Sequence, residues 1–179
     1  MSPAVHPPTR AGSGRRPRRL VRLAAVGMVG ASVMPLVGCS DEYFEDRTAQ
    51  VTIDGRTSDF QVDSCGLDQE TVFVVGRTDG GAVLQAVVGV SVDGEDTFPA
   101  ATGLTVDVGG TVWGSFGPES WARRGQTGPA PGTITSAKVR GARIQARGQV
   151  VELDVDGREA VGARPVDFEF DARCDAGAA

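Results

Sequence analysis

Apolar and polar residues alternate with a period of two through much of the chain from residue 51 onwards. Successive side chains of a strand point to opposite faces, so this alternation predicts strands with one buried face. A continuous apolar run at Thr71–Val75 instead predicts a strand that is buried on both faces. The alternating segments are residues 51–53, 82–92, 104–108, 143–150 and 166–173.

Short interruptions of this pattern predict the connections between strands. Asp54-Gly55 favours a tight hairpin, because both residue types accept positive φ at low cost. The segment from Pro118 to Arg124 predicts one or two helical turns, with proline in the first turn and arginines in the last. The inward-facing phase reverses at Val150–Val151, which predicts a bulge or a tight bend there.

The first 38 residues follow a different pattern. Five arginines between residues 15 and 22 lead into an uncharged run from Leu23 to Gly38. A basic region, an apolar region and a small residue at the cleavage point are typical of a signal peptide. The alternative is a transmembrane helix, but the run has only about 16 residues where a spanning helix needs roughly 20, and it contains Pro35.

The segment ends in Leu36-Val37-Gly38-Cys39, which resembles the lipobox of bacterial lipoproteins. The resemblance implies that residues 1–38 are removed and that Cys39, carrying acyl chains such as palmitate, becomes the new N-terminus. Two or three acyl chains hold a protein on a membrane stably, whereas one chain does so only marginally. We therefore expect a protein on the extracytoplasmic face of the cell membrane, with residues 39–49 as an acidic tether.

Lipidation of Cys39 would leave Cys65 and Cys174 in an oxidising compartment. Two cysteines usually pair there, and two redox-active thiols would normally lie closer in the sequence. We therefore expect a structural disulfide between Cys65 and Cys174. The predicted fold class is mostly β: an antiparallel sheet or β-sandwich with at most one short helix. It forms a single domain over residues 50–176, closed by the disulfide and followed by a tail at 177–179.

Charge and composition narrow the functional classes. The chain after residue 38 has 12 basic and 23 acidic residues, a net formal charge of −11. Nucleic acid and anionic lipid headgroups both favour cationic surfaces, so the charge argues against either as a partner. The only histidine, His6, lies in the predicted signal, which leaves carboxylate pairs or Lys138 as the remaining catalytic groups. We expect neither an enzyme nor a cofactor or metal.

Several segments together resemble the mycobacterial 19 kDa lipoprotein antigen family (LpqH-like small lipoproteins). They are the lipobox, the opening strand at residues 51–55, the early Cys65, the strand at 141–148 and the ending at 168–175. The resemblance implies a small extracytoplasmic lipoprotein without enzymatic activity and with an antigen-like surface role. It also implies that the acylated N-terminus is recognised by lipopeptide receptors where a host is involved.

Three functions remain open at this point. The first is a monomeric interaction module, because both tryptophans lie close to arginines and these residue types are enriched at binding hot spots. Its candidate surface consists of Trp113, Phe116, Trp121, Arg123 and Arg124. The alternative for these aromatic side chains is a place in the core.

The second function is a carrier of an apolar envelope lipid, because small inward residues would leave room for a ligand, although they also permit close packing. These residues are Ala82, Ala86, Ala146 and Gly148. The third is a calcium site at Asp93, Glu95 and Asp96, which lack the ligand number and spacing of a calcium-binding loop.

Overall fold

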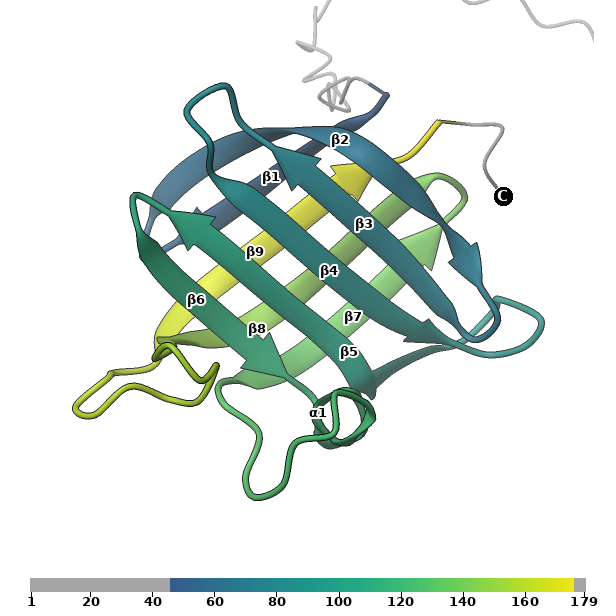
Figure 1. The fold of residues 1–179 in the computed structure, drawn as a ribbon. Helices are drawn as coiled ribbons and strands as arrows, with labels where there is room; N and C mark the ends of the chain where they lie inside the picture. The colour runs from purple at the N-terminus through teal and green to yellow at the C-terminus, as the bar shows by residue number, and fades with distance from the viewer. Residues whose placement is uncertain (1–45, 176–179) are drawn as a thin grey trace, which may run out of the picture. The chain divides into compact units, whose positions relative to one another are not determined.

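The computed structural model describes residues 46–175, which hold nine antiparallel strands and one short helix (Figure 1). Along the sheet, the strand order is β6-β5-β4-β3-β2-β1-β9-β8-β7. No helix in these residues is long and apolar enough to cross a membrane. The elements are β1 (Thr48–Ile53), β2 (Arg56–Asp68), β3 (Thr71–Arg77), β4 (Val83–Val90), β5 (Thr97–Val108), β6 (Thr111–Phe116), α1 (Pro118–Arg123), β7 (Thr133–Arg140), β8 (Arg143–Glu152) and β9 (Val166–Arg173).

The sheet closes on itself through β8. One edge of β8 pairs with β9, while its other edge pairs first with β7 and then with β6. The pairing with β6 joins Trp113 to Glu152 and Gly114 to Val151, and it makes a closed ring of eight strands. The β7 strand lies beside this ring and contacts β5, where the Thr97 hydroxyl donates a 2.6 Å hydrogen bond to the Ala137 carbonyl. The prediction of a mostly β, antiparallel fold is confirmed.

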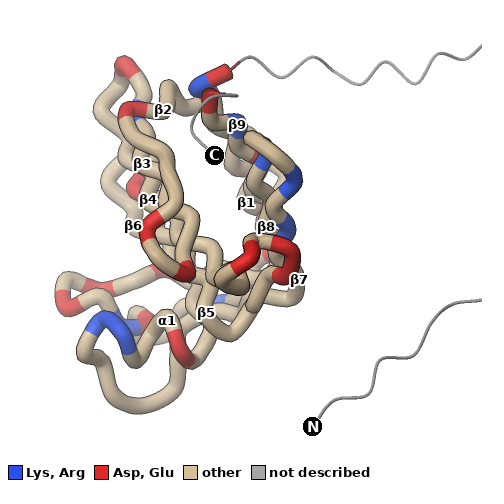
Figure 2. Tube along the Cα trace, turned by 90° about the vertical axis from the view of Figure 1, so that its right-hand side faces the viewer, with Lys and Arg blue, Asp and Glu red and all other residues tan. Residues whose placement is uncertain are grey.

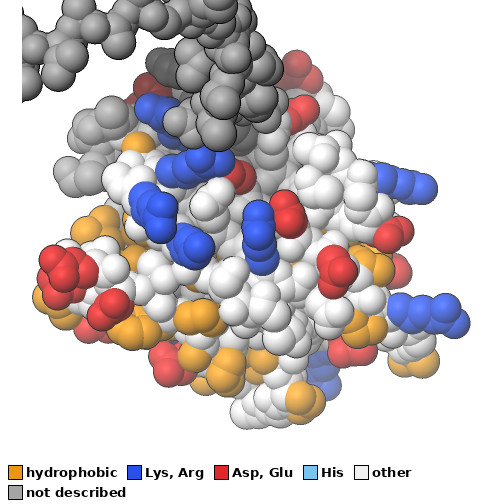
Figure 3. Space-filling model, turned by 180° about the vertical axis from the view of Figure 1, so that it is seen from behind, with side chains coloured by type: hydrophobic (Ala, Val, Ile, Leu, Met, Phe, Trp, Pro, Cys, Tyr) orange, Lys and Arg blue, Asp and Glu red, His pale blue; other side chains and the backbone are white. Residues whose placement is uncertain are grey.

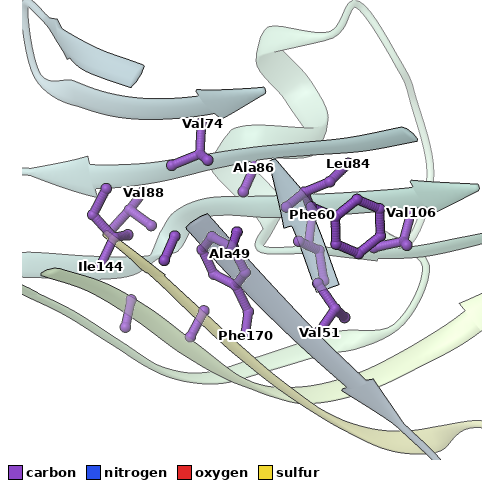
Figure 4. Close-up of a cluster of buried hydrophobic side chains, with 14 of the residues drawn as sticks. Ala49, Val51, Phe60, Val74, Leu84, Ala86, Val88, Val106, Ile144 and Phe170 are labelled. Carbon is purple, nitrogen blue, oxygen red and sulfur yellow. The ribbon is translucent and has the colours of Figure 1, made fainter. Parts of the chain in front are cut away.

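The inner face of the closed sheet holds the main hydrophobic core (Figure 4). Its largest side chains, Phe60, Phe168 and Phe170, are each 2% exposed. Six of the eight predicted inward positions of 143–150 and 166–173 are buried: Ile144, Ala146, Val150, Phe168, Phe170 and Ala172. The other two, Gly148 and Val166, are partly buried. The sequence pattern therefore identified the face of these strands that packs inside.

Two predictions about buried strands were wrong. In Thr71–Val75 only Val74 is fully buried, so this strand has one inner face and a partly open outer one. Val92 is 86% exposed, because β4 ends at Val90 and the following residues form a turn. The continuous apolar run at Thr71–Val75 therefore overstated burial of the outer face, and the alternation at 82–92 extended beyond the end of the strand.

The predicted bulge or bend at Val150–Val151 was also wrong. The β8 strand continues regularly through both residues, with Val150 in the main core. Val151 points to the opposite face, where it joins a second buried cluster with Phe116, Trp121 and Leu153. The apolar phase reverses because both faces of β8 are covered at this point.

The ends of the domain are joined by the predicted disulfide. Cys65 lies in β2 and Cys174 directly follows β9, with their Cα atoms 5.8 Å apart. The tether prediction is wrong for residues 48–49, since β1 begins at Thr48 and Ala49 is fully buried between β2 and β9. Cys39 lies outside the described residues.

Gly148 offers a test of the close approach of β7 to β8. A register shift between Ile134 and Ser136 brings the Thr133 carbonyl so near Gly148 that an added Cβ would overlap its oxygen. We expect Gly148→Ala to lower the free energy of unfolding by about 1–3 kcal/mol, measured by urea denaturation. Gly66→Ala is the control, because its Cβ would lie 3.4 Å from the Phe73 ring, an ordinary contact. Equal stability of the two variants would contradict this view of the β7–β8 packing.

Candidate functional site

The closed sheet has two ends, and each carries an open pocket. We call one the entry end, because the chain enters β1 there at Thr48, beside the end of β9 at Arg173. The β7–β8 hairpin and the disulfide are also at the entry end (Figure 1). The opposite end, which we call the far end, holds the β1–β2 turn and the β5–β6 turn.

Tight turns shape the far end. Asp54 and Gly55 both have positive φ, at 49° and 73°, as the predicted hairpin requires. The β5–β6 turn likewise uses Gly109 and Gly110, with φ of 64° and 81°. Two-residue turns of this kind match the twist of their strands and keep the ends of neighbouring strands in register.

Between these turns lies a pocket of about 290 Å³, the far-end pocket. Its walls come from β1, β2, β5, β6 and β9, so residues distant in the sequence meet there. Asp54 and Arg56 supply two opposite charges among its lining residues. The apolar lining consists of Val51, Ile53, Val106, Val108, Trp113 and Val166. A pocket with both apolar and charged lining residues suits a ligand group that is apolar at one end and polar or charged at the other.

The entry end has a second pocket of about 280 Å³, next to the disulfide. Leu67, which is 56% exposed, lines it together with Val90, Ile144 and Cys174. Asp93 also lines this pocket, and hydrogen bonds from the Ser91 hydroxyl and the Glu95 amide lower the pKa of its carboxyl. These bonds make Asp93 a stabiliser of the β4–β5 turn.

The three acidic residues weighed as a calcium site lie in the β4–β5 turn. Within residues 46–175, no group of three histidine, cysteine, aspartate or glutamate residues could hold a metal ion. The Asp96 amide donates a 2.9 Å hydrogen bond to the Ser91 hydroxyl, and the Glu95 amide donates one to the Asp93 carboxylate, so the segment at residues 93–96 stabilises its own turn.

The predicted interaction surface does not form one surface. Phe116 and Trp121 are 3% and 5% exposed, and they pack against Val151 and Leu153 beneath α1. Their ring centroids lie 5.2 Å apart. The alternative of a place in the core therefore describes these two residues, and including them in a surface was wrong.

The other three residues of that set lie in different places. Trp113 is half-buried and lines the far-end pocket. Arg124 is exposed, with its guanidinium carbon 4.9 Å from the centre of the Phe116 ring, while the exposed Arg123 lines a shallow pocket with Glu119. Trp113 is thus the one member that contributes to a candidate binding pocket.

Sequence reasoning missed both end pockets. The only local signals were the Asp-Gly and Gly-Gly turns, which indicate hairpins but not which hairpins share an end of the sheet. The small inward residues proposed for a carrier lie elsewhere: Ala86 and Ala146 are buried in the main core, where the three phenylalanines fill the interior.

Comparison of the sequence with protein-family models and with curated proteins gives no match.

Proposed function

We propose that this protein is a non-enzymatic, lipid-anchored binding module on the extracytoplasmic face of the cell membrane, and that the far-end pocket is its binding site. The anchor rests on the signal-like segment and lipobox that end at Cys39. The binding role rests on one observation, the far-end pocket, where Asp54 and Arg56 lie beside six apolar side chains.

The position of the pocket suits an anchored protein. The tether leads into the entry end, where Asp46 pairs with Arg173, and β1 then runs from there to the far end. Six residues of strand separate the two ends of β1, a length of about 20 Å. The far-end pocket therefore stays clear of the point where the tether enters.

The size of the pocket favours a module over a carrier. Its volume is at the lower limit of the roughly 300–1,000 Å³ usual for small-molecule sites. Such a pocket takes one side chain of a partner protein or the end of an apolar chain. Because Phe60, Phe168 and Phe170 fill the centre of the sheet, a whole lipid would have no room inside. We propose that the chain belongs to the 19 kDa lipoprotein antigen family, which its end segments resemble.

The anchor is tested by mass spectrometry of protein extracted from a lipidating host. We expect the peptide that begins at Cys39 to carry two or three acyl chains. An unmodified Cys39 in the extracted protein would contradict the anchor and leave the pocket proposal to be judged separately.

The pocket is tested with anilinonaphthalene sulfonate, a fluorescent apolar probe that has an anionic group. We expect Val166→Phe, which fills the far-end pocket, to weaken probe affinity about tenfold. The matched control is Ala142→Phe, which places the same ring at the entry-end pocket and should leave the affinity unchanged. Thermal melting confirms that both variants fold. Weakening by Ala142→Phe alone, or by neither variant, would contradict the far-end site.

A further inference from the structure

Three arginines lie side by side on the outer face of β7, β8 and β9. In the strand register, Arg140 is opposite Arg143, and Arg143 is in turn opposite Arg173. Neighbouring strands are about 4.8 Å apart, and like charges placed directly opposite each other destabilise a sheet. Asp171 and Asp46 offset the charges of Arg143 and Arg173, whereas Arg140 has no ion pair within residues 46–175. The charge that remains points to a role in binding an anionic surface.

The row belongs to a larger basic region, which we call the arginine face. Its basic members are Arg47, Lys138, Arg140, Arg143, Arg147 and Arg173, half of the 12 basic residues that follow Cys39. In Figure 2 basic positions of the sheet gather on the side of β1, β8 and β9, and acidic positions lie near β7 and β8 on that side as well. The acidic positions of the segment from β2 to β6 lie mainly on the other side. Figure 3 shows this face directly, with the blue side chains close together.

Five carboxylates lie among these cations. Four of them pair with arginines, and the fifth, Asp167, accepts a hydrogen bond from Gln149. Asp171 accepts a 2.7 Å bond from Arg143, and Asp46 lies 2.6 Å from Arg173. Weaker pairs join Arg147 to Glu169 at 3.5 Å and Arg47 to Asp175 at 3.3 Å. An arginine has five N–H donors, so a paired guanidinium can still bind a phosphate.

Lys138 and Arg140 complete the face with charge that is not neutralised locally. Both side chains are exposed, and neither forms an ion pair with another residue of 46–175. With six cations and five carboxylates, the arginine face has an excess of one positive charge, in a chain whose portion after residue 38 carries −11. The excess is concentrated at Lys138 and Arg140.

We infer that the arginine face docks on anionic phospholipid headgroups of the bilayer that holds Cys39. This inference rests on the proposed lipid anchor. The chain enters the domain at the edge of the face, because Asp46 pairs with Arg173. Cys39 is seven residues before Asp46, so even a fully extended tether keeps the face within about 25 Å of the membrane surface.

The negative net charge does not prevent this contact. At physiological ionic strength, charges more than about 8 Å from the headgroups are largely screened, so the nearest face determines the interaction. Most acidic residues of the segment from β2 to β6 lie in β2 and in the turns, on the other side of the sheet. Docking of an anchored domain is also intramolecular, so a weak attraction per cation is enough.

The test uses the full lipidated protein in two kinds of vesicle, one of phosphatidylcholine and one of equal parts phosphatidylcholine and phosphatidylglycerol. Phenylglyoxal modifies accessible arginines, and mass spectrometry reports the rate at each position. We expect Arg140 and Arg143 to react about tenfold more slowly on the anionic vesicles, and high salt to abolish the difference. Arg123 and Arg158, outside the face, are internal controls with unchanged rates.

Charge reversal provides the second measurement. Lys138→Glu with Arg140→Glu should remove the protection of Arg147 on anionic vesicles, whereas Arg123→Glu with Arg124→Glu should preserve it. Both double variants alter exposed side chains, and thermal melting checks their folding.

Three results would overturn the inference. If the protein floats with both vesicles but its arginine face is modified at equal rates on both, the docking inference is contradicted and the proposed anchor is not. The arginines could instead be modified slowly on both vesicles. If the triple variant Asp41→Asn, Glu42→Gln, Glu45→Gln then raises these rates, the acidic tether occupies the face. Failure to float with either vesicle would contradict the proposed anchor and this inference together.

Discussion

Replacing both Cys65 and Cys174 with alanine is expected to lower the free energy of unfolding by about 4–5 kcal/mol. The disulfide spans 109 residues, and closing a loop of that length removes much of the conformational entropy of the unfolded chain. Single domains are stable by only about 5–15 kcal/mol, so the loss would leave the domain marginal. Alanine is preferred to serine because Cys174 is 6% exposed and a buried hydroxyl would add a separate cost.

Urea denaturation of the full chain, followed by tryptophan fluorescence, measures this effect. Reduced wild-type protein is the matched control and should unfold at the same urea concentration as the double variant. A change below about 1 kcal/mol would contradict this account, because it would mean that the bond removes little entropy from the unfolded chain. The native pairing of β1 with β2 and β9 would then hold the ends of the domain together without help from the bond.

The features that the sequence predicted correctly are those that depend on neighbouring residues. Alternation located the inner faces of β8 and β9, because side-chain direction in a strand has a fixed period of two. The Asp54-Gly55 hairpin and the helix at Pro118 follow from the φ preferences of single residue types. The disulfide followed from the number of cysteines and their predicted compartment.

The features that the sequence did not reveal depend on register between distant strands. The pairing of Trp113 with Glu152 closes the sheet, yet neither residue type favours that contact. The row of Arg140, Arg143 and Arg173 exists only because three strands align at those positions. The argument against an anionic partner used the total charge, and a sum over the chain carries no information about which face each charge occupies.

The second cluster shows how one local pattern can have two physical causes. A reversal of the apolar phase at Val150–Val151 is compatible with a bulge, and also with a regular strand buried on both faces. The structure has the second arrangement, because α1 and Phe116 cover the outer face of β8. Sequence alone could not decide between them, since the covering residues lie more than 20 positions earlier in the chain.

This arrangement makes Trp121 essential to the outer cluster. Trp121→Ala is expected to cost about 3–5 kcal/mol, because it leaves a large cavity between Phe116 and Leu153. The six-residue α1 is far too short to be stable by itself, so it depends on this side chain for its position. Urea denaturation of the variant measures the loss.

Two companion variants separate a core role from a contact role. Trp121→Phe should cost less than about 1.5 kcal/mol, because it keeps an aromatic ring and removes an indole N–H that has no hydrogen-bond partner within residues 46–175. Arg123→Ala, which changes an exposed side chain of the same helix, should stay within about 0.5 kcal/mol of wild type. Wild-type stability of Trp121→Ala would contradict the core role and return Trp121 to the candidate contacts. Because the cost comes from lost packing, it should be the same in the presence and absence of any partner of the far-end pocket.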